Sequence, residues 1–525
     1  MSKGTNTMSK TLRMPSRATL GAISAVALVA TSGILSSSAA MADGPASSAN
    51  LPDLGKNGTS FHLQAGGADF DTAMPDKSVA TYVMKKGQKP TMYLTTADQG
   101  KNNLKYKVQQ FDAENTSGGP SSGDIRTKPD TNYGQVAGFG ATMTDSAAFL
   151  LQHSPNRDEI MQKLYGQGAD DAHLNIARAP MGSTDLMSDP DDYHSLQDGG
   201  ADTFSIDKHP SDQREIEMLQ QAKKLSGQDF KLIGTPWTAP GWAKKSGQLH
   251  PGNDDGGANE LNMDKTGDYA QYFKKYAEAY DQIGLKPWMV SLQNEPLNPN
   301  TKMPTTQLSK FVQGSNGNWT PDAAEAGKNE VTLAHAVKQA LPQDVGILGW
   351  DHNTDTPDGS EPVAGSDDVD MMGYHSYNST NPSGPNNYQD QSRKKNSLMS
   401  EGSNMVGETD ARDKLGDTVE KDIMGPMRHG ALGSLYWSLM QDSQGNPHFG
   451  SDDSCDSCRG LVTATDNGNY ELSQEYYYYS QFSRFVAPGS TNIESNNSGN
   501  LSSVAFQNGD TTTVVVLNDG DHKVK

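Results

Sequence analysis

Two glutamates with the same kind of sequence setting are the residues best suited to chemistry in this chain. Glu295 follows Asn294 and precedes Pro296, Glu401 follows Ser400, and each closes a short apolar run. Such a pair can cleave a glycosidic bond by double displacement: one carboxyl group protonates the leaving oxygen and later deprotonates water, while the other attacks the anomeric carbon. A lone strand-end glutamate is more simply explained as a hydrogen-bond partner of a loop. Two at comparable positions favour the catalytic interpretation.

Other polar and aromatic residues close or follow further apolar runs and would share the same site. Tryptophan rings offer an apolar platform to sugar faces, and an arginine beside a carboxylate keeps it ionised, as a nucleophile must be. The candidates besides the two glutamates are Arg178, Asp185, Trp237, Asn294, His375, Tyr377 and Trp437. Whether they meet depends on the elements that carry them.

The runs that carry these residues alternate with helical stretches, which indicates an α/β fold. Strands of a closed parallel barrel are buried on both faces and therefore show near-continuous apolar runs, and their carboxyl ends share one mouth. Between the runs, amphipathic spacing predicts helices, for example over 268–283. The eight predicted strands are 136–143, 174–181, 231–237, 289–295, 345–352, 369–377, 397–401 and 433–439. We therefore predict a (β/α)8 TIM barrel.

Both flanks of the predicted barrel differ from it in pattern. Segments 78–108 and 493–516 alternate apolar and polar residues and contain Asn-Gly and Gly-Asp turn signals, which is typical of antiparallel strands. We predict an accessory β-sandwich domain built from both chain ends. The expected divisions are a signal peptide at 1–42, a disordered linker at 43–76, N-terminal sandwich strands at 77–130, the catalytic barrel at 131–470, and the last barrel helix with the C-terminal sandwich strands at 471–525.

The first 42 residues have the order of a secretory signal. Lys10, Arg13 and Arg17 precede an apolar stretch, and Ala40-Met41-Ala42 provides a small-residue cleavage site. A single membrane anchor is the alternative, but small and polar residues dilute the apolar stretch. We expect a secreted, extracellular protein with no integral membrane segment after signal cleavage.

Composition and charge exclude several classes of partner. The net charge of −21 repels phosphate backbones and anionic lipid headgroups, so neither nucleic acid nor an anionic membrane is an expected partner. No motif requires a cofactor or a metal. Asp189, Asp191 and Asp192 could suggest calcium, but their spacing is not that of a known loop, and a solvated acidic loop is the preferred interpretation.

The two cysteines, Cys455 and Cys458, form a C-x-x-C pair. Half a zinc site or a redox motif would be alternatives, but there is no second cysteine pair and no thioredoxin-like context. In an exported chain we expect a local disulfide, with little influence on chemistry because it closes so short a loop.

Several motifs in order resemble glycoside hydrolase family 30, whose clan includes lysosomal glucosylceramidase. The resemblance spans roughly residues 136–488. Its motifs include Gly138-Phe139-Gly140-Ala141, Thr144-Asp145-Ser146, Thr235-Pro236-Trp237, Asn294-Glu295-Pro296, Ser400-Glu401 and Tyr436-Trp437. It implies that Glu295 is the acid/base, that Glu401 is the nucleophile, and that Asn294 contacts the sugar 2-hydroxyl. It further implies that Asp185, Trp237 and Trp437 line the subsite of the cleaved sugar. Arg178, His375 and Tyr377 would support the nucleophile.

The leading hypothesis is a secreted retaining β-glycosidase of the glucosylceramidase-like β-glucosidase type, acting on a β-linked glycoside or oligosaccharide. Alternatives within the family are an endo- or exo-β-1,6-glucanase or galactanase, and a β-xylosidase or fucosidase. A non-catalytic carbohydrate-binding barrel is a third class, which has no need for an acid/base pair. The family's β-domain usually continues by another strand, so we expect the last strand to be absent or the chain to be truncated.

Overall fold

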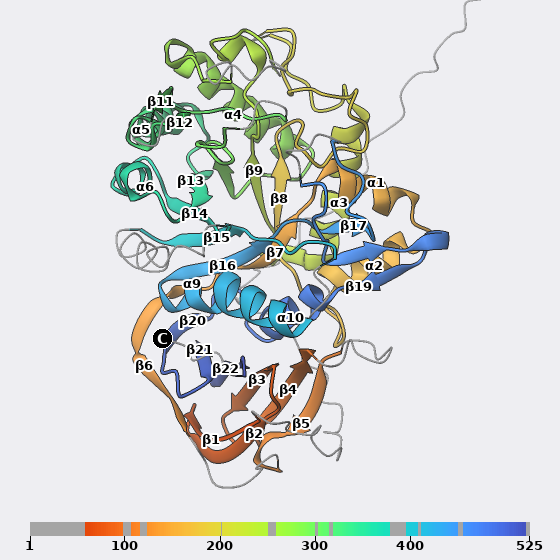
Figure 1. The fold of residues 1–525 in the computed structure, drawn as a ribbon, viewed down its shortest axis with the longest axis vertical. Helices are drawn as coiled ribbons and strands as arrows, with labels where there is room; N and C mark the ends of the chain where they lie inside the picture. Colours follow the sequence, from red (N-terminus) through yellow and green to blue (C-terminus); the bar gives the residue numbers. More distant parts are fainter. Residues whose placement is uncertain are drawn as a thin grey trace, which may run out of the picture. The chain divides into compact units, whose positions relative to one another are not determined.

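A closed eight-stranded barrel forms the centre of the structure. The computed structural model describes residues 58–97, 107–115, 123–200, 202–249, 259–299, 303–313, 319–377, 395–407, 411–449 and 455–520. All barrel strands run parallel and β16 pairs with β7 to close the ring (Figure 1). Each predicted run overlaps one strand, so the predicted TIM barrel is confirmed. The strands are β7 (Gly138–Thr142), β8 (Ile176–Pro180), β9 (Lys231–Thr235), β10 (Met289–Ser291), β13 (Gly346–Asn353), β14 (Met371–His375), β15 (Ser397–Glu401) and β16 (Ala431–Tyr436).

Helices follow most of the barrel strands and cover the outside of the barrel. In α4 (Thr266–Gln282) the side chains of Tyr269, Tyr272, Phe273, Tyr276 and Tyr280 recur at helical spacing, and all are buried. The other α-helices of the described ranges are α1 (Asp145–His153), α2 (Arg157–Tyr165), α3 (Pro210–Ser226), α5 (Ala323–Ala340), α6 (Pro357–Ala364), α8 (Ala411–Gly416), α9 (Gly425–Arg428) and α10 (Gln474–Ser483), with a π-helix over Asp417–Met424. Two small sheets complete this part: β11 (Phe311–Gln313) with β12 (Trp319–Pro321), and β17 (Met440–Asp442) with β18 (Val462–Ala464) and β19 (Tyr470–Leu472).

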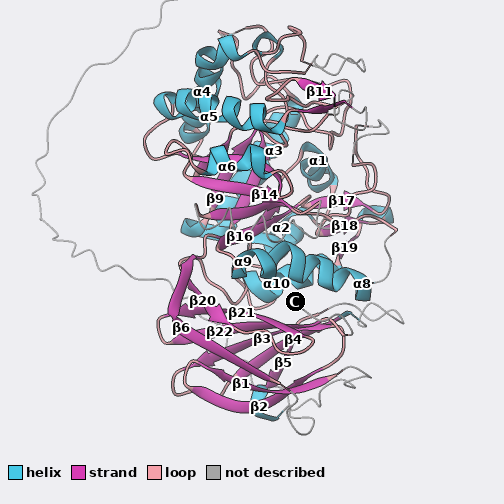
Figure 2. Ribbon diagram, turned by 60° about the vertical axis from the view of Figure 1, so that its left-hand side comes forward, coloured by secondary structure: helices cyan, strands magenta, loops and turns pink. Residues whose placement is uncertain are grey.

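A second, strand-rich part is assembled from both ends of the described chain (Figure 2). Strand β22 pairs along its whole length with β3, which lies more than 400 residues earlier. Its nine strands follow the order β2-β1-β6-β20-β21-β22-β3-β4-β5. The two ends of this order pack on each other, because Phe61 of β1 and Phe70 of β2 contact the ring of Tyr82 in β3. The strands are β1 (Thr59–Ala65), β2 (Ala68–Met74), β3 (Ser78–Lys85), β4 (Thr91–Thr96), β5 (Gln109–Asp112), β6 (Asp124–Gln135), β20 (Thr491–Ser495), β21 (Leu501–Asn508) and β22 (Thr511–Asn518).

The expected linker at 43–76 is wrong over its second half, because β1 and β2 form an antiparallel hairpin there. Phe61 and Leu63 are completely buried, and Phe70 is nearly so. These alternating apolar residues are the physical reason for the strands, and the surrounding polar composition concealed them. The expected boundary at 131 also falls inside β6, which belongs to the strand-rich part. The predicted signal peptide lies outside the described residues.

None of the helices in the described ranges combines the length and apolar character that a membrane crossing requires.

Helix α10 joins the barrel to the strand-rich part through a buried glutamine. The hydroxyl of Thr81 in β3 donates to Oε1 of Gln481 at 2.7 Å, and Nε2 of Gln481 donates to the hydroxyl of Thr95 in β4 at 2.8 Å. All three side chains are inaccessible to solvent. A buried polar group of this kind is stabilising only while its partners are present.

We expect Gln481→Leu to lower the free energy of unfolding by about 1–2 kcal/mol, because it removes both side-chain hydrogen bonds, while the hydroxyls of Thr81 and Thr95 keep main-chain carbonyls as acceptors. Chemical denaturation measures the change. Gln220→Leu on the exposed face of α3 is the matched control and should stay within about 0.5 kcal/mol of the wild type. Equal effects of the two substitutions would contradict this role of Gln481.

Candidate active site

Most candidate residues from the sequence lie at or just beyond the carboxyl ends of barrel strands. In a parallel barrel these ends share one mouth, which is where active sites of this fold form. Arg178 lies in β8 and Asp185 in the loop after it; Trp237 follows β9; Asn294 and Glu295 follow β10; His375 ends β14, with Tyr377 beyond it; Glu401 ends β15; and Trp437 follows β16. The strand pattern therefore predicted a common location for all of them.

The two glutamates face each other across His375. A carboxylate oxygen of Glu295, one of Glu401 and a ring nitrogen of His375 all lie within 4.8 Å of one another. His375 Nδ1 lies 3.0 Å from Oε1 of Glu295 and 3.6 Å from Oε1 of Glu401. Carboxyl groups about 5 Å apart are close enough for one to attack a sugar carbon directly, whereas inverting hydrolysis needs a wider gap that admits a water. The spacing suits double displacement.

A buried arginine holds Glu401. Arg178 is inaccessible to solvent and donates from Nη1 to Oε2 of Glu401 at 2.5 Å. Its Nη2 donates to Oδ1 of Asn294 at 2.6 Å and to Oδ2 of Asp351 at 2.9 Å. Burial opposes the arginine's charge, but Asp351 and Glu401 outweigh it and raise the pKa of Arg178. The guanidinium also lies over the ring of Trp237, 4.5 Å from its centre.

Asp351 is a buried site residue that our sequence reasoning did not single out. Its Oδ2 accepts hydrogen bonds from Arg178 and, at 2.6 Å, from the hydroxyl of Ser291, while its Oδ1 accepts at 2.6 Å from the hydroxyl of Ser400. His375 Nε2 also lies 3.2 Å from Oδ1. Asp351 is the next-to-last residue of the predicted strand 345–352, and its place near the carboxyl end of that strand was the available signal.

Backbone strain accompanies this arrangement. Glu295, Trp350 and Asp351 all have positive φ, at 48°, 69° and 46°, and the β13–β14 register shifts between Trp350 and His352. Left-handed backbone at residues other than glycine costs of order 1–3 kcal/mol and tends to be retained at functional sites. Here the bulge lies at Asp351, whose carboxylate faces the barrel interior and accepts a hydrogen bond from Arg178.

His375 and Tyr377 have different partners, although both were expected to support Glu401. The hydroxyl of Tyr377 donates to Oε1 of Glu401 at 2.8 Å, as expected. His375 lies closer to Glu295, whose other oxygen accepts from Nδ2 of Asn298 at 2.7 Å. Burial opposes the charge of His375, but Glu401, Asp351 and Glu295 outweigh it and raise its pKa to about 10. Burial likewise opposes ionisation of Glu295, but His375 outweighs it and lowers the pKa of Glu295 to about 2.

An apolar wall borders the catalytic pair. Trp237 and Trp437 stack with ring centres 5.1 Å apart and planes at 28°, and each is only 3% exposed. They form one cluster with Leu186, Met303 and Cys458. The two rings that were expected to offer a platform to a sugar therefore form a single surface.

Asp185 and the cysteine pair lie beside this wall. The structure joins Cys455 to Cys458 in a disulfide, as expected. Asp185 is 6% exposed, and burial raises its pKa to about 6. The backbone N–H of Cys455 donates to Oδ2 of Asp185 at 3.0 Å, a contact that spacing alone does not indicate.

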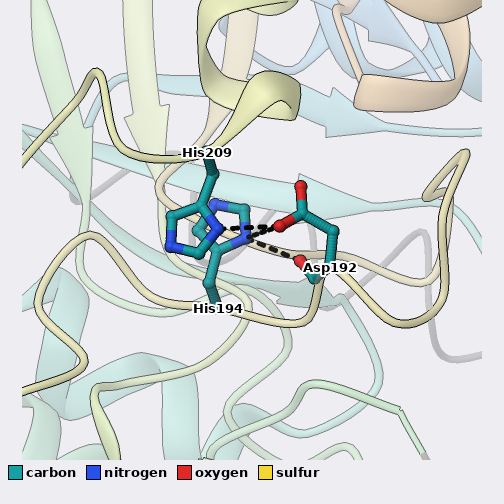
Figure 3. Close-up of side chains that lie close together, drawn as sticks. All are labelled: Asp192, His194 and His209. Atoms are coloured by element: carbon teal, nitrogen blue, oxygen red, sulfur yellow. Dashed lines mark hydrogen bonds and ion pairs between the residues drawn. The ribbon is translucent and has the colours of Figure 1, made fainter.

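A second group of histidines and carboxylates lies on the loop that carries Asp185 (Figure 3). The rings of His194 and His209 are parallel, with centres 3.7 Å apart, and both turn a nitrogen toward Asp192. His194 Nε2 also lies 3.0 Å from Asp212, and His209 Nε2 lies 3.3 Å from Asp198. Parallel rings do not aim their nitrogen lone pairs at one point, so this arrangement suits ion pairing between loop and helix α3 better than metal ligation. Of the acidic residues that were expected to be solvated, Asp192 thus contacts His194 and His209.

We expect this cluster to make stability depend on pH. Burial opposes the charge of His194, but Asp212 and Asp192 outweigh it and raise its pKa. A raised pKa contributes stability in full below the unfolded value of about 6.5, and the contribution is lost as pH rises through the folded pKa. The thermal midpoint of His194→Gln should therefore fall further below the wild type at about pH 5.5 than at about pH 9.

His335→Gln on the exposed face of α5 is the matched control, because a solvent-screened contact with Asp368 contributes little at either pH. A deficit of His194→Gln that grows with pH would contradict the assignment.

Three kinds of comparison agree on the relatives of this chain. The profile described as "Glycosyl hydrolase family 30 TIM-barrel domain" matches residues 136–486. An endo-1,6-β-D-glucanase of Trichoderma harzianum is 31% identical over 428 residues, covering 77% of this chain and 81% of the relative. The lysosomal acid glucosylceramidase of Mus musculus is 30% identical over 175 residues, covering 33% of each chain.

Among solved structures, one described as the endo-β1,6-glucanase BT3312 matches with a TM-score of 0.64 and 19% identity, covering 84% of this chain and 99% of the other. At that identity the likeness supports the fold alone. The profile, by contrast, spans well over half of the chain, and the sequence likeness to the Trichoderma enzyme extends over most of both proteins. Together with the close pair of glutamates, these findings show that the chain belongs to glycosyl hydrolase family 30 and is a retaining glycosidase.

Proposed function

We propose that this enzyme is an endo-acting β-1,6-glucanase. The observation that carries the proposal is the degree of likeness: two relatives named endo-1,6-β-D-glucanases are 31% and 29% identical to this chain over 428 residues. Putative glucosylceramidases of Caenorhabditis elegans are 26% and 27% identical over 411 and 412 residues, and the mouse glucosylceramidase aligns along one third of its length. The proposal replaces the glucosylceramidase-like specificity that the sequence motifs favoured. It adopts the β-1,6-glucanase specificity that the sequence had offered as an alternative. A signal segment at 1–42 would deliver such an enzyme to an extracellular polymer.

In the proposed mechanism Glu401 is the nucleophile. Its two oxygens accept hydrogen bonds from Arg178 and Tyr377, which fix the orientation of the carboxylate. Attack on the anomeric carbon forms a covalent glycosyl-enzyme and expels the leaving oxygen. The side-chain oxygen of Asn294 accepts a hydrogen bond from Arg178, so its amide N–H groups are the ones that would donate to the sugar 2-hydroxyl.

Glu295 is the proposed acid/base, and its proton has to come from a neighbour. The lowered pKa of Glu295 means that its carboxyl group is ionised in the free enzyme, while the raised pKa of His375 means that the imidazole holds a proton. His375 Nδ1, at 3.0 Å, is the nearest such donor in the described part of the chain. Transfer of that proton to Glu295 on substrate binding would prepare it to protonate the leaving oxygen. In the second step Glu295 deprotonates water.

Hydrolysis of a linear β-1,6-glucan tests the proposal. We expect a rapid fall in polymer length, which indicates endo action, and reducing ends of β configuration when first released, as read by NMR. β-1,6-Galactan, xylan, glucosylceramide and aryl β-glucosides form the comparison panel. Faster turnover of any of these than of β-1,6-glucan would overturn the specificity.

Two variants serve as controls for the mechanism. Glu401→Gln should lower kcat by roughly 10⁴-fold or more on every substrate, because no glycosyl-enzyme can form. Glu295→Ala should still react with aryl glycosides whose leaving group needs no proton, then stall, and added azide should release a β-glycosyl azide. An α-configured azide product would contradict the assignment.

Asp351→Asn tests the network behind the nucleophile. An amide at this position cannot accept hydrogen bonds at both ends from Arg178, His375 and the serine hydroxyls, so the glutamates lose their alignment. We expect kcat to fall by about 10²-fold while the protein stays folded by circular dichroism. Asp367→Asn, an exposed change just before the next strand, is the control. A kcat within twofold of the wild type in Asp351→Asn would show that the network is dispensable.

A further inference from the structure

The loop that contains the disulfide is fastened to the segment that follows β15. The backbone N–H of Val406 donates to the carbonyl of Ser457 at 2.6 Å, and Met405 forms an isolated β-bridge with Cys458. Cys458 is completely buried, whereas Cys455 is partly exposed. One end of the bridge is therefore anchored in the apolar wall, and the other end is the residue that contacts Asp185.

Asp185 is held at one oxygen and open at the other. Cys455 N–H donates to Oδ2, and the N–H of Phe449 donates to the main-chain carbonyl of Asp185 at 2.7 Å. Oδ1 is buried and has no hydrogen-bond partner among the described residues. A buried carboxylate oxygen without a partner is costly unless a ligand supplies the missing donor. A sugar hydroxyl is such a donor.

We propose that the Cys455–Cys458 bridge is a positioning device for substrate: it fixes the Cys455 N–H against Oδ2 of Asp185 and so aims Oδ1 at a hydroxyl of the bound sugar. The inference rests on the proposed function, since it presumes that Asp185 contacts the sugar. It revises the expectation that the bridge has little influence on chemistry.

A local role fits the size of the loop. The bridge joins residues only three positions apart, so it removes little conformational entropy from the unfolded chain and adds little to global stability. Hydrogen bonds, by contrast, weaken steeply when the angle or distance at the donor changes. Without the bridge, Cys455 loses its covalent tie to the buried Cys458, and the direction of its N–H is no longer fixed.

The charge on Asp185 depends on the same contact. Burial is the main cause of its raised pKa, the Cys455 N–H acts in the lowering direction, and Glu401 and Glu295 raise it further. Tyr193 also faces it, and burial together with Asp185 raises the pKa of that phenol. Loss of the Cys455 contact would raise the pKa of Asp185 still more, so Oδ1 would cease to be an ionised acceptor at a higher pH than in the wild type.

The test compares the wild type with Cys455→Ser/Cys458→Ala on β-1,6-glucan over a range of pH, since alanine keeps the buried position of Cys458 apolar. We expect KM to rise about tenfold, with a smaller change in kcat, and the acid limb of kcat/KM to move to higher pH. The thermal midpoint should change little. Asp456→Ala, an exposed change inside the same loop that keeps the bridge, is the matched control and should leave both readouts unchanged. Dithiothreitol, which reduces the bridge to two thiols in the folded wild type, should reproduce the shift if the double variant is unstable.

Binding separates this inference from the proposed function. In the Glu401→Gln background, calorimetry with a β-1,6-linked gluco-oligosaccharide should show weaker binding after the cysteines are replaced. If the wild type cleaves another panel substrate and not β-1,6-glucan, the proposed specificity fails, and the comparison is made on that substrate instead. The positioning role would be overturned if loss of the bridge left KM, the binding affinity and the acid limb of kcat/KM all unchanged. A uniform loss of kcat and thermal stability, with the acid limb unmoved, would also overturn it in favour of a purely structural bridge.

Discussion

The buried positive charge of Arg178 is the constraint around which the barrel mouth is organised. A guanidinium fully withdrawn from water costs several kcal/mol unless its donors meet acceptors of opposite charge. Glu401 and Asp351 supply the charge and Asn294 a neutral oxygen, so four barrel strands must present these side chains to one point. Losing either carboxylate would leave the buried guanidinium less well compensated, which links the stability of the fold to the geometry of the site.

The same requirement accounts for the irregular backbone. Regular pleating would let successive residues of β13 alternate between the barrel interior and the surrounding helices. The bulge and the positive φ angles at Trp350 and Asp351 interrupt that alternation. The cost of the strain is offset by the four groups that Asp351 satisfies. Two of these groups are serine hydroxyls, Ser291 on β10 and Ser400 on β15, which donate hydrogen bonds to the Asp351 carboxylate.

Outside the barrel interior, the long loops are held by contacts that reach the same mouth. The stacked histidines tie the loop after β8 to helix α3, and the disulfide loop after β17 contacts Asp185 on that same β8 loop. The loop that carries Asp185 is thus held by the helix that follows it, and Asp185 itself is contacted by a segment that lies 270 residues later in the sequence. Loop position, rather than the barrel itself, is where members of one fold can differ in the substrates they accept.

The amino-acid sequence was enough to predict the eight barrel strands and to place Glu295 and Glu401 near the ends of two of them, because buried parallel strands need apolar runs and their carboxyl ends converge whatever the loops do. It also predicted that both chain ends contribute strands to one accessory domain. Only the tertiary structure shows that Asp351 lies in the site, that His375 lies closer to Glu295 than to Glu401, and that Cys455 contacts Asp185. Those facts depend on a bulge and on loop packing between distant segments, which leave no periodic signal. The hairpin of β1 and β2 was missed for a related reason. Its few apolar residues are buried through packing against Tyr82, which lies in another strand.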